Sequence, residues 1–285
     1  MVHLAAGQLE AHIAADGFLS ITSLTRGGRE LLLSMEDLPA KYGVHGTSAG
    51  ITLLHPWANR LGSDDFDPDD PLVARDPNGL AIHGLRAPEG AWSLRAHGAG
   101  GAVASLQHEG AAGSPFPHPH RVEVAVALEA LGLRVATTIH ADGGVDVPIS
   151  FGWHPYLRPP GSRFNWELGL PPRRHLALDD RGLPTGEGAE EPEEHALLGP
   201  RTFDDLYDDL RPGAVLEVGA GGIGLALRLD EGYPVGQVFA PGDASVVSLE
   251  PMTAPVDALR TGRGLRVVPA GSALTASFAL GVRGL

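Results

Sequence analysis

The chain has 285 residues and a formal net charge of −14, from 21 basic and 35 acidic residues. This acidic balance disfavours non-specific binding to nucleic acid or to anionic membranes, so we expect neither as a partner. The absence of cysteine excludes disulfides, thiolate nucleophiles and cysteine-ligated metal sites.

The N-terminal sequence MVHLAAGQLEAHIAADGFLS lacks a basic segment followed by a sustained apolar run, so it does not predict a signal peptide. No stretch approaches the roughly 18 apolar residues of a membrane-spanning helix. We therefore expect a cytoplasmic protein. Because no fixed-period repeat or clear boundary interrupts the chain, we expect one domain over residues 1–285, a length that β-sandwiches often reach.

Short apolar runs punctuated by 39 glycines and 24 prolines predict strands along most of the chain. Apolar residues alternate in 121–127 and again in 133–140, and Leu131-Gly132 between them predicts a hairpin turn. Together these strands predict an all-β fold, a large and mainly antiparallel β-sandwich. The predicted strands are Leu9–Ala14, Phe18–Leu24, Arg121–Ala130, Gly132–Ala141, Val145–Phe151, Ala214–Val218, Ile223–Leu229, Val235–Phe239, Val246–Glu250 and Ala273–Val282.

Few segments depart from this pattern. Asp204–Leu210 predicts one short helical turn, and Leu183–Glu194 predicts a loop. Gly62–Gly79 is rich in aspartate but lacks the ligand spacing of an EF-hand, so it predicts a solvated acidic loop rather than a calcium site. The histidines of Pro117-His118-Pro119-His120 could bind a metal, yet no third ligand is evident, which favours a surface loop. The acidic loop contains Asp64, Asp65, Asp67, Asp69, Asp70 and Asp76.

Four clusters place polar side chains inside apolar surroundings, as a catalytic cleft requires. Any one of them alone favours a structural role. The clusters are Pro56-Trp57-Ala58-Asn59-Arg60, Ile82-His83-Gly84-Leu85-Arg86, Phe151-Gly152-Trp153-His154-Pro155-Tyr156 and Val246-Val247-Ser248-Leu249-Glu250-Pro251.

Taken together and in order, these segments resemble the aldose 1-epimerase, or galactose mutarotase-like, family. The resemblance extends from about residue 40 to 265, and His-Pro-Tyr and Glu-Pro-Met-Thr are its most specific motifs. Asp205 is the alternative to Asp204 in the fourth segment. The matching segments are LLHPWANRLG with Asn59 and Arg60, IHGLRAPEGAW with His83, FGWHPYL with His154, TFDDLYDDL with Asp204, VGQVFAPGD with Gln237, and SLEPMTAPVDAL with Glu250.

The resemblance implies a single large β-sandwich that interconverts the α and β anomers of a free aldose. It implies Glu250 as general base and His154 as general acid, without a cofactor or a metal ion. It also implies that sugar hydroxyls bind to Asn59, Arg60, His83, Asp204 and Gln237. Aromatic side chains that could stack on the sugar are Trp57, Trp92, Trp153 and Tyr156. We expect a small-molecule sugar as the partner, and a monomer or weak homodimer.

Three other functions remain open from the sequence. A hexose-6-phosphate or other acidic-sugar 1-epimerase would need cations near the site, and Arg158 or the pair Arg173-Arg174 could supply them. A non-catalytic sugar-binding protein could use the same fold, because fold alone does not secure activity. A metal-dependent hydrolase has little support, since no helical His-x-x-x-His spacing occurs. The sequence does not identify the sugar.

Overall fold

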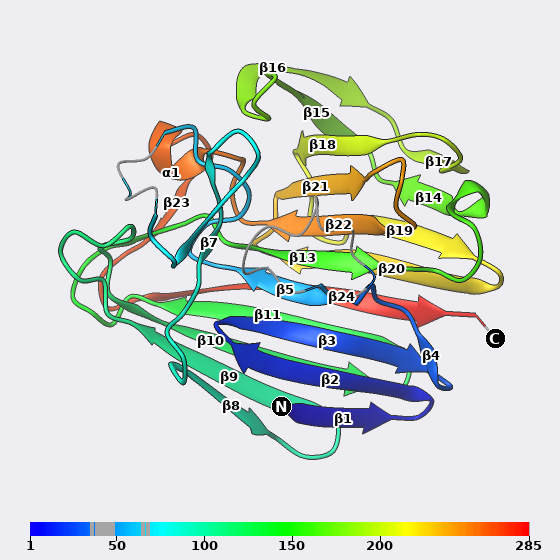
Figure 1. Cartoon of the computed structure of the whole chain (residues 1–285), viewed down its shortest axis with the longest axis horizontal. Coiled ribbons are helices and arrows are strands. Elements are labelled where there is room, and N and C mark those ends of the chain that lie inside the picture. The colour runs from blue at the N-terminus through cyan, green and yellow to red at the C-terminus, as the bar shows by residue number, and fades with distance from the viewer. Residues whose placement is uncertain (35–36, 38–48, 64–65, 67–68, 285) are drawn as a thin grey trace.

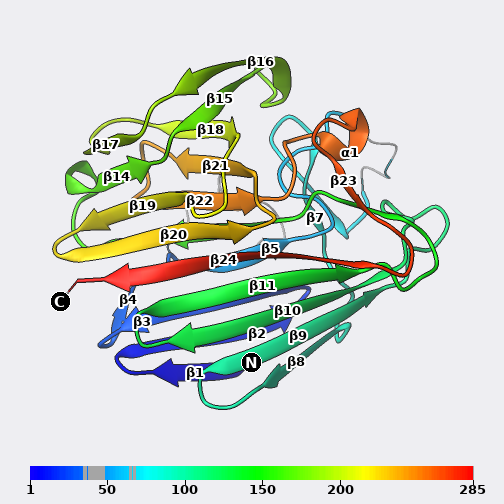
Figure 2. The same cartoon turned by 180° about the vertical axis from the view of Figure 1, so that it is seen from behind.

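The computed structural model describes residues 1–34, 37, 49–63, 66 and 69–284. In this part of the chain nearly all regular structure is β, as the sequence predicts. Two large antiparallel sheets face one another, one seen in front in Figure 1 and the other in front in Figure 2. The predicted β-sandwich is therefore confirmed.

The first sheet has eleven strands, in the order β1-β2-β3-β5-β13-β22-β21-β18-β15-β16, with β4 paired to β3. Its strands are β1 (Val2–Ala6), β2 (Leu9–Asp16), β3 (Phe18–Arg26), β4 (Arg29–Glu30), β5 (Ile51–Leu54), β13 (Gly152–Leu157), β15 (Arg173–Leu178), β16 (Pro184–Glu191), β18 (Phe203–Asp208), β21 (Val235–Ala240) and β22 (Val247–Met252).

The second sheet has nine strands, in the order β17-β14-β19-β20-β24-β11-β10-β9-β8. Its strands are β8 (Trp92–Ala96), β9 (Gly101–His108), β10 (His120–Glu129), β11 (Gly132–His140), β14 (Glu167–Leu170), β17 (Glu194–Leu197), β19 (Val215–Ala220), β20 (Ile223–Glu231) and β24 (Ala273–Arg283).

Two short ribbons and two helical turns complete the regular structure of the described residues. β6 (Val73–Arg75) pairs with β7 (Ala81–Leu85), and β12 (Val147–Ile149) pairs with β23 (Arg266–Val268). The helices are the 3₁₀ turn η1 (Arg163–Asn165) and α1 (Ala258–Thr261). Figure 1 shows β7, α1 and β23 together at one end of the sandwich, beyond the ends of the long strands.

The main core lies between the two sheets, because alternate residues of most strands point inward. In β10 the buried positions are every second residue from His120 to Leu128. Trp153 of β13 reaches across from the first sheet and donates its indole Nε1–H to the Thr137 hydroxyl of β11, at 3.0 Å. This contact ties the two layers together at their centre.

The central strands β13 and β22 are buried over their whole length, so both of their faces are covered. Their inner faces join the main core. Their outer faces touch two smaller clusters, one containing Leu54, Leu206 and Met252, the other Tyr156 and Val246. Polar side chains on this outer face are therefore removed from water, although they are not part of the main core.

Several local predictions were wrong. Asp204–Leu210 lies mostly in strand β18, because it pairs with both β15 and β21. Leu183–Glu194 contains the edge strand β16, whose exposed residues lack the apolar alternation that signals a half-buried strand. Within Val145–Phe151 only the three residues of β12 are a strand. The β10–β11 hairpin exists, but Glu129 pairs with Gly132, so the turn is Ala130-Leu131.

The acidic segment Gly62–Gly79 also differs from the prediction of a solvated loop. It includes β6, and Asp76 is buried. Asp64, Asp65 and Asp67 lie outside the described residues. Among the helices of the described chain, none is long and apolar enough to cross a membrane.

Candidate active site

A cross-strand row of polar side chains lies at the middle of the eleven-stranded sheet, on its outer face. Thr52 of β5 is opposite His154 of β13, and Gln237 of β21 is opposite Glu250 of β22. The β13–β22 register, with Gly152 opposite Met252, also places His154 opposite Glu250. Residues that are far apart in sequence are thus brought side by side on one pleated face.

His154 and Glu250 form the central pair of this row. Imidazole Nε2 lies 3.2 Å from carboxylate Oε1, and the two side chains are only 6% and 2% exposed. On the other side of the ring, Nδ1 lies 2.9 Å from the Ser248 hydroxyl. Tyr156 stacks on the imidazole with 4.1 Å between ring centroids. The ring is therefore fixed in one orientation.

Burial shifts the pKa of both groups toward their neutral forms. It lowers the pKa of His154 to about 3. It raises the pKa of Glu250 well above its usual value, and the nearby Asp204 charge raises it further. The site therefore disfavours an isolated charge on either group. The proton between His154 Nε2 and Glu250 Oε1 can reside on the imidazole, which gives an ion pair, or on the carboxylate, which gives a neutral pair.

The two segments that face the pair have unusual backbone conformations. His83 has φ +64° and Asn59 has φ +59°, and His83 N–H donates to the Asn59 carbonyl at 3.0 Å. Gly84, with φ +81°, packs so closely on His55 that a Cβ would lie 2.1 Å from its carbonyl oxygen. Such left-handed residues other than glycine are uncommon and cluster at functional sites.

Arg60 reaches the cavity between two carboxylates. Its Nε donates to Asp76 Oδ2 at 2.8 Å, and its Nη2 lies 3.8 Å from Asp204 Oδ2. Its Nη1 also donates to the Asn59 side-chain oxygen at 3.2 Å. Asp76 Oδ1 accepts the backbone N–H groups of Asn78 and Leu80, so the turn that leads into β7 also fixes the guanidinium.

Asp204, rather than Asp205, faces the polar row. Gln237 Nε2 donates to Asp204 Oδ1 at 2.7 Å. Asp205, the next residue of the strand, points to the opposite face, where it lies 3.5 Å from His175 Nε2. Because successive side chains of a strand point to opposite faces, only Asp204 of these two aspartates lies on the face of the polar row.

A cavity of about 230 Å³ lies among these side chains, and all of the predicted site residues except Gln237 line it. Three buried polar atoms near it have no hydrogen-bond partner among the described residues: Glu250 Oε2, Gln237 Oε1 and His83 Nδ1. Buried polar groups without partners are rare, and their grouping here indicates a place for a polar ligand. The lining residues are Asn59, Arg60, Asp76, Pro77, Ile82, His83, His154, Tyr156, Asp204, Phe239 and Glu250.

Two polar residues of the site, Asp76 and Ser248, were not predicted from the sequence. Asp76 was hidden within the acidic run, although Asp76-Pro77-Asn78-Gly79 is a strong turn signal whose aspartate caps the turn. Ser248 precedes Glu250 by two residues, and strand periodicity could have placed both on one face.

The aromatic residues near the cavity also differ from the prediction. Tyr156 lines the cavity, as does Phe239, which was not considered. Trp153 is in the main core, Trp57 is fully buried in a small apolar cluster, and Trp92 lies on β8 of the other sheet. None of these three tryptophans lines the cavity.

The Pro117–His120 segment differs from the predicted surface loop at its last residue. His120 is buried, and its Nε2 lies 2.7 Å from Nε2 of His55. His108 packs beside His120, with 4.9 Å between ring centroids. In the described part of the chain, no group of three His, Asp or Glu side chains has the geometry to hold a metal ion.

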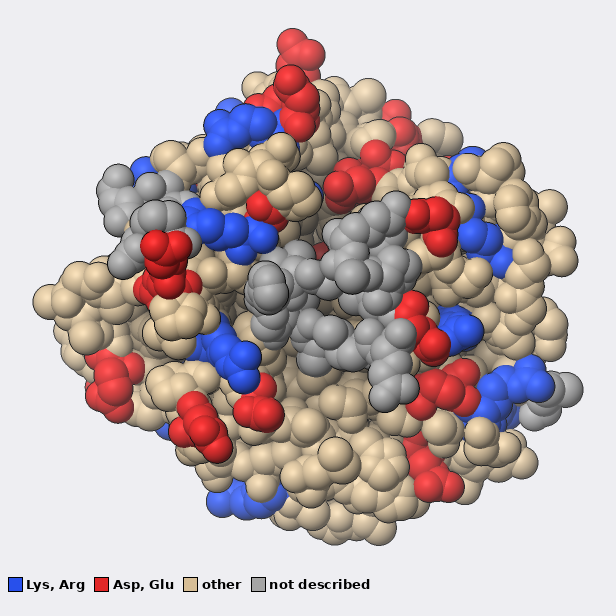
Figure 3. Space-filling view, in the orientation of Figure 1, with Lys and Arg blue, Asp and Glu red and all other residues tan. Residues whose placement is uncertain are grey.

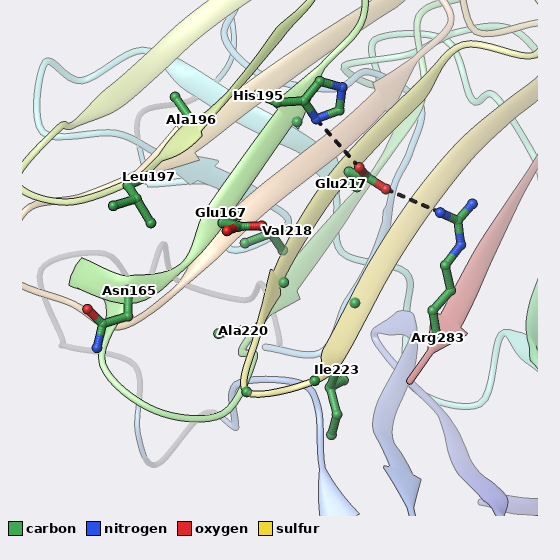
Figure 4. Close-up of a pocket in the computed structure, with 15 residues that line it drawn as sticks. Asn165, Glu167, His195, Ala196, Leu197, Glu217, Val218, Ala220, Ile223 and Arg283 are labelled. Atoms are coloured by element: carbon green, nitrogen blue, oxygen red, sulfur yellow. Dashed lines mark ion pairs between the residues drawn. The ribbon is translucent and has the colours of Figure 1, made fainter. Parts of the chain in front are cut away.

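A second hollow lies on the outer face of the nine-stranded sheet (Figure 4). It contains none of the predicted site residues. Glu217 lies 3.7 Å from His195 and 3.6 Å from Arg283, and these side chains are between 34% and 71% exposed. These three charged side chains of the groove are therefore in contact with water and paired through Glu217.

The arginines considered for phosphate binding do not line the cavity. Arg158 forms a 2.6 Å ion pair with Asp37. Arg173 is buried between Glu191 and Glu194, at 2.6 and 3.1 Å. Arg174 pairs with Asp208 at 3.3 Å. Among the described lining residues, Arg60 is the only Lys or Arg.

In a comparison with known families, the model of the aldose 1-epimerase family matches residues 2–281 of the chain. The chain belongs to the aldose 1-epimerase family. No curated protein matches it.

The face seen in Figure 3 intersperses acidic and basic side chains and shows no continuous basic patch.

Solved structures of the same fold extend over nearly the whole chain. An Escherichia coli K12 protein provisionally assigned as an aldose 1-epimerase is 21% identical over 99% of this chain and 98% of its own, with a TM-score of 0.75. A galactose mutarotase related enzyme from Lactobacillus acidophilus is 14% identical over 99% and 97%, with a TM-score of 0.80. A galactose 1-epimerase from Lactobacillus acidophilus NCFM is 13% identical over 97% and 95%, with a TM-score of 0.69.

Proposed function

We propose that this family member is an aldose 1-epimerase that interconverts the anomers of a free aldose in the cavity on the eleven-stranded sheet. The observation that carries the proposal is the buried contact between His154 Nε2 and Glu250 Oε1, beside unpaired polar atoms. An acid and a base that are both held within reach of one ligand are what ring opening of a hemiacetal requires.

In the proposed reaction the ionised Glu250 takes the proton of the anomeric hydroxyl. The C1–ring oxygen bond breaks, and the ring oxygen takes the proton of His154 Nε2. The open-chain aldehyde rotates about C1–C2, and ring closure on the other face returns both protons. The ion pair present before opening and the neutral pair present after it hold the same number of protons. Burial disfavours the charged form of each group, which brings these two distributions closer in energy.

The surrounding groups suit the binding of a polyhydroxylated ligand. Arg60 and His83 supply donors, and Asp204 supplies acceptors, as binding of ring hydroxyls requires. Gln237 is not among the lining residues; it donates to Asp204, and its unpaired Oε1 is a further acceptor near the cavity. Asn59 uses its side-chain oxygen to hold Arg60, so we assign it to shaping the site as well as lining it. No step requires a metal ion or a cofactor.

A neutral sugar fits better than a phosphorylated one. Arg60, the only lining cation among the described residues, already faces Asp76 and Asp204. Arg158 and Arg173 form ion pairs with other carboxylates, those of Asp37 and Glu191. A phosphate or carboxylate placed here would meet two acidic side chains for one cation, which opposes its binding.

The test is polarimetry on freshly dissolved α-glucose, α-galactose and α-glucose 6-phosphate, with and without the purified protein. We expect faster mutarotation of at least one free sugar and little effect on the phosphate. Acceleration of the phosphate alone would support the acidic-sugar alternative. Sugar binding without any acceleration would support a non-catalytic sugar-binding protein.

A further inference from the structure

We propose that Ser248 is a positioning residue that holds the proton on Nδ1 of His154, so that Nε2 is the nitrogen that exchanges a proton during the reaction. The inference rests on the proposed function for its kinetic part. Its structural part concerns the imidazole alone and can be tested without any sugar.

Strand β22 contacts both nitrogens of the imidazole. Ser248 and Glu250 are two residues apart, so their side chains lie on the same face of the strand. Ser248 Oγ lies 2.9 Å from Nδ1, and Glu250 Oε1 lies 3.2 Å from Nε2. The stacked Tyr156 ring prevents the imidazole from turning away from either contact.

The Ser248 oxygen can accept the hydrogen bond that keeps a proton on Nδ1. In the ion pair that precedes ring opening, Nδ1–H of the imidazolium donates to Ser248, and Nε2–H donates to Glu250. In the neutral pair that follows, Nδ1–H still donates to Ser248, and Nε2 is without a proton. Nδ1 therefore keeps its proton through the proposed reaction, and Nε2 is the nitrogen that exchanges one.

Ser248 contacts His154 Nδ1, and its hydrogen bonding to Glu250 also lowers the pKa of that carboxyl, against the larger opposing effect of burial. Ser248 is fully buried and does not line the cavity, so it does not reach a bound sugar. Other charged or titratable groups face His154 from the surrounding elements: Glu250 from β22, Tyr156 from β13, His83 from β7, and Arg60 and Asp204 across the cavity. None of them is recorded in contact with Nδ1, so the Ser248 contact is the specific one.

The decisive variants are Ser248→Ala, which removes the hydroxyl, and Ser248→Cys, which keeps the volume with a poor hydrogen-bonding group. We expect kcat to fall by about tenfold to a hundredfold in both, since a hydrogen bond to a charged group is lost. We expect KM to change less than about twofold, because no sugar contact is removed. The alkaline limb of kcat against pH should move to lower pH, since the protonated pair loses the stronger hydrogen bond.

Ser248→Thr, which retains a hydroxyl, should restore most of the activity and the wild-type pH profile. The matched control is Thr137→Val. It removes a buried hydrogen bond of similar length, 3.0 Å to Trp153, on the opposite face of β13. It should reduce stability without moving the pH profile.

Nitrogen-15 NMR of the His154 ring gives a readout that does not depend on activity, because Nδ1 and Nε2 shifts report tautomer and charge. We expect Ser248→Ala to shift the Nδ1 resonance at a given pH. Unchanged ring shifts, or a wild-type kcat and pH profile in Ser248→Ala and Ser248→Cys, would overturn the proposal. If the wild-type protein accelerates no sugar, the proposed function fails, and the ring shifts alone decide the role of Ser248.

Discussion

The outer faces of the two sheets each have a hollow lined by charged side chains, yet they differ in how those side chains are solvated. On the eleven-stranded sheet, His154 and Glu250 are almost fully buried, and nearby polar atoms lack partners. On the nine-stranded sheet, Glu217, His195 and Arg283 are exposed and paired with one another. Among the described residues, buried polar groups without partners therefore distinguish the two hollows, and they indicate a ligand site only on the eleven-stranded sheet.

The cause of the difference is what covers each face. The segments around Asn59 and His83 fold back over the middle of the eleven-stranded sheet. The groove on the other face is lined in part by glycines, Gly169, Gly219 and Gly224, which have no side chains to cover it. Covering a polar row excludes water and strengthens the electrostatic interactions within it. A row without cover remains an ordinary hydrated surface.

The largest expected effect on the mutarotation rate comes from replacing a glutamate by glutamine in the cavity, compared with the same replacement in the groove of the other face. Glu250→Gln keeps the shape of the side chain but cannot accept a proton, so mutarotation should slow by about 10²–10⁴-fold. Glu217→Gln in the exposed groove should leave the rate unchanged. Initial-rate polarimetry on both variants checks this, with circular dichroism as the folding control. Equal effects of the two substitutions would remove the distinction between the faces.

The next effect concerns the carboxylate that holds Arg60. Asp76→Asn keeps an acceptor for the turn but removes the charge that faces Nε at 2.8 Å. Loss of such a charged hydrogen bond costs about 1.5–3 kcal/mol, so we expect kcat/KM to fall by about tenfold to a hundredfold.

Asp70→Asn is the matched control for Asp76→Asn. The Asp70 side chain accepts the Leu72 N–H at 2.9 Å in an exposed turn of the same segment. It should change the unfolding free energy by less than about 0.5 kcal/mol and leave kinetics intact. A normal kcat/KM for Asp76→Asn would show that Arg60 does not depend on this anchor.

A smaller effect should appear in the pH dependence of stability. Burial raises the folded-state pKa of Glu250 well above the ordinary value of a glutamate, about 4.5. Its contribution is therefore fully present below about pH 4.5 and is lost as the pH rises toward the folded pKa. Glu250→Gln, which imitates the protonated acid, should gain stability over the wild type as the pH rises.

Urea unfolding of both proteins from about pH 5 to about pH 8 measures this difference. Glu217→Gln again serves as the control, because the exposed Glu217 should show no such trend. A stability difference between wild type and Glu250→Gln that is constant with pH would contradict the burial of an ionisable group at this position.

The fold class and the central pair were predictable from the sequence, for different reasons. Alternation within the strands is local, so β10 and β11 were located within one residue. His154 and Glu250 were identified through their motifs, although 96 positions separate them and no local pattern shows that they meet. The structure adds their contact and their burial.

Other features could not be predicted because they depend on tertiary context. Edge strand β16 is exposed on most of its length and so has no apolar periodicity. Asp76 is one aspartate in an acidic run, and only the approach of Arg60 distinguishes it. Ser248 is unremarkable until β13 places Nδ1 of His154 beside it. The positions of β16, Asp76 and Ser248 thus depend on contacts with residues far away in sequence, which the residue types alone do not indicate.

The most direct test of the central claim is a crystal structure of Glu250→Gln with a free aldose that the wild-type protein turns over. This variant should bind the sugar without converting it. We expect the sugar in the cavity, with its anomeric hydroxyl at the side chain of residue 250 and its ring oxygen at His154 Nε2. A sugar found in the groove of Figure 4, or one whose anomeric carbon is remote from both residues, would contradict the account.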